Sequence, residues 1–471
     1  MARVSGPAGV AVLPFATRHG DSERGLSAVP HNRQIPPAPG GSLVSETLTQ
    51  SKVPLVTEDV TCVFCGLHCD DLKIRLKADE VIPTRLDCAK AVEAYAVTAR
   101  QAVARVNGRE TSREEALKVA ASLIKSSKRP LLGGLGTDVA GMRAALRLAE
   151  RCNGLLDHMH SAASLRNLHV LQQRGWHTTT LGEIHNRADL IVLVGAEVER
   201  AFPRFLARHV AVRHALQGER LGSRRLAYLG PAAEAPGPDS GLPTDIIPMP
   251  RDALAENLRT LQGLVAGHRM PPSTGKRGAG LKALAARITA AAYPVFVWAP
   301  GQLPAATGDL VIAAVCDLVA MINRTRRAAG LALGGDDGAQ TALATSGWLT
   351  GFGAGIGFQA GALQPRGEAA GGADVLLGRG DADLLLFISN FSRRSPTRGA
   401  WPVIALAPPG MEPPEPVEVY IPVGIPGIDH AGQIIRTDGV VALPLRAVRP
   451  ARHPSTAATL DAIARALRVS V

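Results

Sequence analysis

The chain has 471 residues, of which 46% are hydrophobic and 20% charged, and its 52 Lys and Arg residues exceed its 41 Asp and Glu residues. This length and composition predict a globular protein with a large buried core, divided into two to four domains. The formal net charge of +11 suggests acidic partners. Nucleic acid is disfavoured as a partner, because only 4% of the residues are aromatic and the basic residues do not gather in a known motif.

The sequence indicates neither a membrane span nor a secretory signal. Its longest apolar stretch, residues 309–321, is interrupted by Asp317 and is shorter than the roughly 20 residues that cross a bilayer. The N-terminus lacks a strong basic flank and a small-residue cleavage pattern. We therefore predict a cytoplasmic protein, in which cysteines at metal-site spacing are better explained as ligands than as disulfides.

In chain order, residues 1–54 come first and are rich in Pro, Gly and Ser, which predicts a poorly ordered extension. A cysteine-rich segment follows at 55–108, with a strand predicted over 71–76 and a helix over 89–102.

The remainder is predicted as a first α/β region at 109–270 and a second at 271–471, joined by a linker at 270–280. In the first region, buried strands are predicted at 129–136, 188–197 and 224–230, and helices at 139–154 and 252–266. In the second, strands are predicted at 293–301, 383–390, 402–409, 417–424 and 440–448, and helices at 308–325 and 458–467. Short apolar runs between helical patterns are typical of parallel strands covered on both faces. The fold class is therefore α/β: two doubly wound regions behind a small cysteine-rich segment.

The cysteine-rich segment carries the pattern C-x2-C-x3-C-x18-C, formed by Cys62, Cys65, Cys69 and Cys88. Three close thiols with a distant fourth are typical of a [4Fe-4S] cluster. Zinc is an alternative, although structural zinc more often uses two closely spaced pairs. The third alternative is that the four cysteines hold no metal.

Other residues with chemical potential have plainer interpretations. His68 is a possible substitute ligand but is expected to be an exposed loop residue, and Cys152 and Cys316 are expected to be inert core thiols. Of Asp70 and Asp71, one is expected to cap the cysteine loop and the other to be solvated.

Four arginines form a basic group, and the first three recur at helical spacing: Arg200, Arg204, Arg208 and Arg213. They predict a helix with one basic face. That face is either solvated or a contact for an anionic cofactor or a partner subunit.

The stretch TEDVTCVFCGLHCDDLKIRL at 57–76 resembles the start of the B subunit of formylmethanofuran dehydrogenase, in the molybdopterin oxidoreductase superfamily. Blocks at 346–368, 373–390 and 417–448 resemble that B subunit in the same order, so the resemblance covers roughly residues 56–450. It implies a [4Fe-4S] cluster on the four cysteines and a molybdopterin-oxidoreductase-like fold. In that family, the α/β regions enclose a molybdenum or tungsten bis-pterin guanine dinucleotide.

The sequence departs from that family where a cysteine ligates the molybdenum or tungsten. The corresponding stretch, 154–170, has no cysteine, and Ala163 aligns with the ligand and Ser164 with the histidine usually beside it. A methyl group cannot coordinate a metal, so we expect no catalytic residue here and no molybdopterin. The other cofactor-binding residues stay unassigned. The glycine-rich stretch 351–358 is either a cofactor contact or a tight buried connection.

With this departure, the resemblance implies a related assembly of methylotrophic bacteria, the formyltransferase/hydrolase complex. It moves a formyl group between tetrahydromethanopterin and a methanofuran-like carrier and releases formate. The chain would be its non-redox scaffold subunit, with an amidohydrolase-like, a formyltransferase and a further structural subunit as partners.

Two other functions stay open. One is an active formylmethanofuran dehydrogenase B subunit, with Ser161 or Ser164 as metal ligand. The other is an unrelated four-cysteine zinc protein with a binding function.

Overall fold

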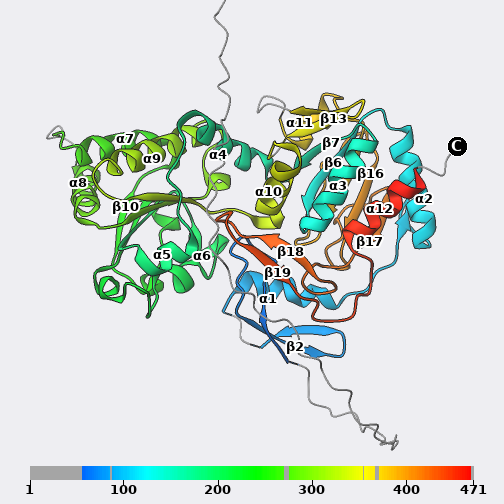
Figure 1. Ribbon diagram of the computed structural model, residues 1–471, viewed down its shortest axis with the longest axis horizontal. Coiled ribbons are helices and arrows are strands. Elements are labelled where there is room, and N and C mark those ends of the chain that lie inside the picture. The colour runs from blue at the N-terminus through cyan, green and yellow to red at the C-terminus, as the bar shows by residue number, and fades with distance from the viewer. Residues whose placement is uncertain (1–55, 85–86, 270–274, 354, 366–370, 468–471) are drawn as a thin grey trace, which may run out of the picture. The chain divides into compact units, whose positions relative to one another are not determined.

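The computed structural model describes residues 56–84, 87–269, 275–353, 355–365 and 371–467. The predicted extension at 1–54 lies outside the described residues. The described strands form four sheets, and Figure 1 shows the helices that cover them.

The first sheet has three antiparallel strands, in the order β1 (Val56–Val60), β2 (Leu72–Lys77) and β3 (Glu80–Pro83). The cysteine loop connects β1 to β2, and helix α1 (Ala89–Ala96) begins directly after Cys88. A short 3-10 turn at Val97–Ala99 follows, so the predicted helix over 89–102 is shorter than its apolar pattern suggested.

The largest sheet has nine strands, and its centre is parallel. The order is β14 (Ala362–Pro365), β13 (Ile356–Gln359), β7 (Leu155–His158), β6 (Pro130–Gly136), β15 (Leu384–Ser389), β16 (Val403–Ala407), β17 (Val419–Pro422), β4 (Arg105–Val106) and β5 (Arg109–Glu110). The five strands from β7 to β17 run parallel, and an antiparallel pair closes each side. Every residue of β6, β15 and β16 is buried, as expected for parallel strands covered on both faces.

A second large sheet is entirely parallel. Its order is β10 (Thr244–Pro248), β9 (Arg225–Gly230), β8 (Leu190–Val194), β11 (Pro294–Trp298) and β12 (Ala329–Ala332). A two-stranded antiparallel hairpin, β18 (Gly432–Ile435) and β19 (Ala442–Leu445), is the fourth sheet.

Helices pack on both large sheets. Those of the nine-stranded sheet include α2 (Arg113–Ser126), α3 (Val139–Arg151), α10 (Ala339–Thr350), α11 (Ala373–Gly378) and α12 (Thr456–Ala466). Those near the five-stranded sheet include α4 (Ser161–Arg174), α5 (Leu181–Arg187), α6 (Val198–Ala201), α7 (Leu254–Val265), α8 (Gly275–Ala290) and α9 (Gly308–Ile322).

Capping residues fix where several of these helices begin. The Ser112 side chain accepts a hydrogen bond from the Glu115 backbone N–H at the start of α2, and Asp138 accepts from the Gly141 N–H at the start of α3. Helix α3 buries Met142 and Ala145 in an apolar cluster, and it packs against both α12 and α10.

The mixed α/β fold is confirmed, but the sheets do not follow the predicted regions along the chain. Strands β8 and β11, from opposite sides of the predicted boundary at residue 270, are neighbours in one sheet. Residues 275–280 of the predicted linker open helix α8, and β17 lies inside the nine-stranded sheet. Apolar runs indicate where strands occur, whereas their pairing depends on contacts between distant parts of the chain.

Within the part of the chain that the structure describes, no helix combines the length and apolar character needed to cross a membrane.

Candidate functional site

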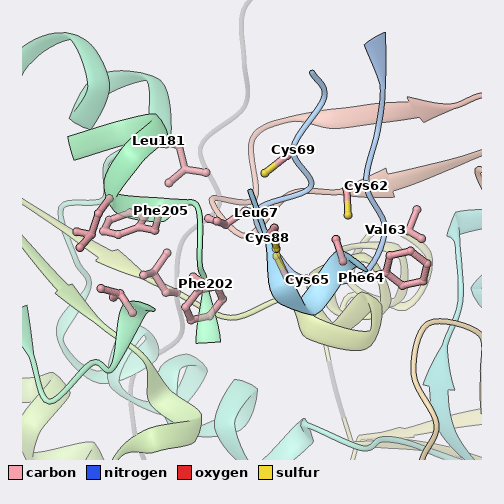
Figure 2. Packing of buried hydrophobic residues seen from close by; sticks show 14 of the residues in the cluster. Cys62, Val63, Phe64, Cys65, Leu67, Cys69, Cys88, Leu181, Phe202 and Phe205 are labelled. Atoms are coloured by element: carbon pink, nitrogen blue, oxygen red, sulfur yellow. The ribbon is translucent and has the colours of Figure 1, made fainter. Parts of the chain in front are cut away.

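The four cysteines of the motif come together around one small cavity of ≈ 10 Å³. All four are buried and none forms a disulfide. Two backbone hydrogen bonds close the loop, from Cys62 N–H to Cys69 O (2.7 Å) and from His68 N–H to Cys65 O (3.1 Å). His68 itself adopts a left-handed φ of 43°, which turns the chain toward Cys69. Figure 2 shows the sulfur atoms among the packed apolar side chains of the same cluster.

Burial decides the charge of these thiols. It raises the pKa of Cys65 to about 12, with a further contribution from the charge of Asp336. Burial also raises the pKa of Cys62 well above its ordinary value, and the neighbouring Cys65 adds to the effect. Both thiols are therefore protonated at neutral pH unless a metal cation stabilises the thiolate form.

The donor atoms of the four-cysteine motif are all sulfur, and the four side chains surround a shared space. Within the described residues, no group of three or more Cys, His, Asp or Glu side chains is arranged to hold a metal ion in the structure as it stands. Four thiolates are ligands of both structural zinc and [4Fe-4S] clusters, so the donor set suits either group chemically.

His68 is buried rather than exposed, which corrects the sequence prediction. Its Nδ1 lies 3.1 Å from the Cys62 carbonyl oxygen, and its Nε2 has no hydrogen-bond partner. Burial lowers the pKa of His68 to about 4, so the ring is neutral at physiological pH. The ring is held inside the protein by its contact with the Cys62 carbonyl oxygen.

The loop docks on a second segment through Gly66. The Gly66 N–H donates to Asp336 Oδ1 (3.0 Å), and its carbonyl accepts from the Thr437 N–H (2.9 Å). A Cβ atom added at Gly66 would lie 1.6 Å from the Gly334 carbonyl oxygen, so only glycine permits this approach. Lys90, two residues after Cys88, forms an ion pair with the other oxygen of Asp336 at 2.7 Å.

Segment 334–336 also forms part of the wall of the large cavity that contains Ala163. The cavity measures ≈ 410 Å³ and lies beyond the carboxyl ends of β11 and β12. Ligands of parallel α/β sheets commonly bind at this edge. Its walls include Ala163, Ser164, Gly301, Asp336 and Gln340.

Ala163 and the two nearby serines differ in where they lie. Ala163 and Ser164, in the first turn of α4, both contribute to the ≈ 410 Å³ cavity, whereas Ser161 borders neighbouring cavities of ≈ 250 and ≈ 350 Å³. Of the two serines predicted as alternative metal ligands, only Ser164 therefore borders the cavity of Ala163. None of the described residues that line this cavity is a cysteine.

The glycine-rich stretch 351–358 lies apart from this cavity. Gly353 and Gly355 border a separate space of ≈ 20 Å³. Strand β13 begins at Ile356 and pairs with β7. Among the described residues, the stretch contributes nothing to the ≈ 410 Å³ cavity, which favours the interpretation as a structural connection.

The sequence did not reveal a polar network centred on Asp337. The carboxylate of this buried residue accepts hydrogen bonds from His160 Nε2 (2.9 Å), Arg394 Nη2 (2.9 Å) and the Ser392 hydroxyl. Burial acts to raise the pKa of Asp337, but the His160 hydrogen bond and the Arg394 charge outweigh it and hold that pKa well below its usual range. Asp337 has a left-handed φ of 53°, and the Gly-Gly-Asp-Asp-Gly run at 334–338 was the available signal.

His158 completes the network. Its Nδ1 accepts from the His160 backbone N–H (3.0 Å), so the proton resides on Nε2, which donates to the Asp337 carbonyl oxygen (3.0 Å). Burial, assisted by the nearby His160, lowers the pKa of His158 to about 4.

The remaining predicted residues also have definite places. Cys316 is buried in α9, and Cys152 is half-buried at the end of α3, consistent with structural thiols.

The predicted helix through the arginine group is interrupted: α6 ends at Ala201, and a π-helical turn, η2, spans Leu206–Val210. Arg204 forms an ion pair with Asp71, and Arg208 forms one with Asp70. Both aspartates are exposed at the surface, so each is a solvated ion-pair partner.

Comparison with known proteins places these features in context. No family model matches the chain. It is 29% identical over 370 residues to the B subunit of the formyltransferase/hydrolase complex of Methylorubrum extorquens, which covers 77% of this chain and 96% of that protein. It is also 29% identical over 164 residues to the B subunit of the tungsten-containing formylmethanofuran dehydrogenase 2 of Methanocaldococcus jannaschii, covering 33% of this chain and 38% of that protein.

A solved structure agrees with the sequence comparison. A chain in the crystal structure of the formyltransferase/hydrolase complex (FhcABCD) of M. extorquens with methylofuran matches with a TM-score of 0.66 and 26% identity. The match covers 78% of this chain and 99% of that chain. The chain is thus similar along most of its length to the B subunit of the formyltransferase/hydrolase complex and, over a shorter stretch, to the B subunit of formylmethanofuran dehydrogenase, which confirms the resemblance inferred from the sequence.

Proposed function

We propose that the chain is a non-redox scaffold subunit of a formyltransferase/hydrolase complex in one-carbon metabolism. The complex would transfer formyl groups between tetrahydromethanopterin and a methanofuran-like carrier and release formate. The observation that carries this proposal is the similarity to the B subunit of such a complex over 96% of that subunit's length.

The non-redox character is supported by the cavity beside Ala163. Its wall offers a methyl group at the position where the related dehydrogenases supply a cysteine, and none of its described residues is a cysteine. Its volume of ≈ 410 Å³ suits one drug-sized molecule. A pair of pterin guanine dinucleotides is larger than this cavity, which supports the proposal that the chain holds no molybdopterin.

The proposed partners are an amidohydrolase-like subunit, a formyltransferase subunit and a further structural subunit. Exposed apolar side chains at the end of α10 and just after it, Trp348, Leu349 and Phe352, give the chain a surface suited to protein contact. The net charge of +11 favours acidic partners or an acidic carrier. We place the complex in the cytoplasm, since the described cysteines are all free thiols.

A [4Fe-4S] cluster is the proposed cofactor, held by Cys62, Cys65, Cys69 and Cys88. The buried, sulfur-only donor set around one cavity supports it. When bound, the cluster would cross-link the loop to the start of α1. We also propose the finer fold assignment, a molybdopterin-oxidoreductase-like arrangement, because a cysteine-rich segment precedes two sheets with parallel centres.

The alternative is an active molybdenum or tungsten formylmethanofuran dehydrogenase B subunit. The presence of Ser164 at the cavity favours it, since its hydroxyl could in principle ligate a metal. The two functions differ in metal content and in electron transfer.

Metal analysis of the assembly purified without oxygen separates them. The scaffold function predicts about four irons per chain, neither molybdenum nor tungsten, and no dye reduction by the isolated chain with a formylated carrier. Stoichiometric molybdenum or tungsten, together with carrier-dependent dye reduction, would establish the alternative.

The cluster assignment has its own test in Cys65→Ser. Thiolate ligation connects the loop to α1, so this change should reduce iron content and lower the melting temperature of the loaded chain. Cys152→Ser is the matched control, because Cys152 lies outside the motif and its Sγ is 3.8 Å from the Ala149 carbonyl oxygen of its own helix. Equal iron content and equal melting temperatures in the two variants would mean that the motif holds no metal.

The scaffold role is tested by deletion of the chain from the assembly. We expect an amidohydrolase-like and a formyltransferase subunit to co-purify with it, and their joint activity to be lost without it. A stable and fully active complex of those two subunits alone would refute the scaffold role.

A further inference from the structure

Two arginines from the segment between β8 and β9 reach the cysteine loop. Arg204 Nη1 and Nη2 donate to the two carboxylate oxygens of Asp71 at 2.7 and 2.8 Å, and its Nε lies 2.8 Å from Asp87 Oδ1. Arg208 pairs with Asp70 at 2.9 Å and with Asp71 at 3.2 Å. These carboxylates flank two of the four cysteines in the chain.

The arginines are turned inward, whereas their carboxylate partners face solvent. The side chains of Arg204 and Arg208 are 14% and 23% exposed, against 43% to 66% for the three aspartates. Arg204 borders the cavity formed by the four cysteines. Arg208 pairs with Asp70, the residue that directly follows Cys69 in the chain.

An anionic group in the cavity would explain why these two arginine side chains are turned inward. Four thiolates around either a zinc ion or a [4Fe-4S] cluster in its oxidised form carry a net dianionic charge. A buried charge of that size is costly unless opposite charges and hydrogen bonds accompany it. Arg204 and Arg208 provide two positive charges at the cavity and beside Cys69.

We propose that Arg204 and Arg208 are the counter-charges of a dianionic metal–thiolate centre on the four cysteines. This inference rests on the proposed metal centre and adds the residues that stabilise it. Asp70, Asp71 and Asp87 position the two guanidinium groups.

The same contacts join the metal centre to the large cavity. Ala201 and Phe202 lie in the wall of the ≈ 410 Å³ cavity, and Phe202 and Phe205 pack in one apolar cluster with the four cysteines. Lys90 Nζ also lies 3.5 Å from the Ala201 carbonyl oxygen. Metal loading of the loop therefore restrains segment 198–210 and, through it, one wall of the cavity.

The test measures metal retention in the full chain, loaded with iron and sulfide without oxygen and then challenged with a chelator. In Arg204→Gln and Arg208→Gln, we expect metal loss about tenfold faster or more, because each removes a charged partner of a buried thiolate centre. Hydrogen exchange across 198–210 should rise in the loaded variants toward the level of the metal-free chain. Arg200→Gln is the control, since Arg200 is 84% exposed and pairs with Glu197 of its own segment.

Two further variants test whether the arginines act through their positive charge on the metal centre or only through their ion pairs with the aspartates. Arg208→Lys keeps the positive charge and should retain metal better than Arg208→Gln. Asp71→Asn removes an ion pair but leaves the arginine charges, so it should retain metal better than Arg204→Gln.

The outcomes are distinguishable. If the double variant Arg204→Gln with Arg208→Gln retains metal as long as Arg200→Gln does, or if Asp71→Asn loses it as fast as Arg204→Gln, the counter-charge proposal is overturned. If the unaltered chain takes up neither iron nor zinc, the proposed metal centre fails as well. Zinc in place of iron, with the same order among variants, supports the counter-charges while refuting the iron cluster.

Discussion

The cysteine loop and the cavity beside Ala163 share segment 334–336 as a common wall, yet they are built differently. The four cysteines surround a space of ≈ 10 Å³, and charged pairs lie around them. The cavity beside Ala163 is ≈ 410 Å³, and its wall has a methyl group where a ligand is expected. The four cysteines also pack in an apolar cluster, whereas Ala163 only borders an open space.

The largest expected effect comes from Gly66→Ala, which would break the contact between the two sites. The new methyl would overlap the Gly334 carbonyl oxygen, a backbone atom that cannot rotate away. We expect the free energy of unfolding to fall by about 3 kcal/mol, measured by denaturant titration.

Gly334→Ala is the matched control, because a Cβ there meets no atom within 4 Å. The docking of the loop would not depend on Gly66 if the two variants had the same stability.

A smaller effect per pH unit is expected from the pH dependence of the network beside the cavity. The pKa of His158 is lowered from 6.5 to about 4, so the unfolded chain binds a proton in this window that the folded chain does not. The free energy of unfolding therefore falls as pH falls from 6.5 toward 4, by up to roughly 1.4 kcal/mol per pH unit from this residue. His158 faces Asp337 and His160, with Arg394 on the far side of the Asp337 carboxylate.

His158→Gln should flatten that slope while retaining an amide donor for the Asp337 carbonyl. Urea titrations at several pH values give the slopes. His169→Gln, which removes an imidazole that contacts Gln173 on α4, is the control for a general effect of losing a histidine. Equal slopes in the unaltered chain and in His158→Gln would show that His158 titrates normally.

The smallest effect is expected from Ala163→Cys, which returns a thiol to the cavity wall. The cavity has room for the sulfur, so the free energy of unfolding should change by no more than about 0.5 kcal/mol. We expect no carrier-dependent dye reduction, because under the proposed scaffold function a single thiol does not restore a redox cofactor. Gain of such activity with bound molybdenum or tungsten would show that Ala163 alone separates this chain from a redox enzyme.

The sequence predicted those parallel strands that are clear apolar runs, whereas β7, β10 and β12 were not predicted. The strands at 130–136, 190–194 and 384–389 lie within the predicted ranges. Their neighbours could not be predicted, since β11 joins β8 across about a hundred residues of chain. The pairing of strands so far apart in the chain depends on the assembled core, and the local pattern of apolar residues does not indicate it.

The candidate site was predicted in part for the same reason. The cysteine spacing is a local pattern, and the structure does bring the four sulfurs to one cavity. The Asp337 network joins three separate parts of the chain: Asp337 itself, His160, and the pair Ser392 and Arg394. His68 lies in a loop that docks through Gly66 on Asp336. Asp336 is 270 residues away in the chain, so the local sequence could not predict this burial.

The strand order of the nine-stranded sheet has a consequence for synthesis of the chain on the ribosome. Strand β4 at 105–106 pairs with β17 at 419–422, whereas all five strands of the parallel sheet fall between 190 and 332. The strands of the five-stranded sheet are thus an uninterrupted insertion, and they can pair before the surrounding sheet is complete. The surrounding sheet is complete only when the last quarter of the chain arrives, and its early strands must wait with apolar faces uncovered. Chaperones are therefore expected to matter most for the early strands β4 to β7, at residues 105–158.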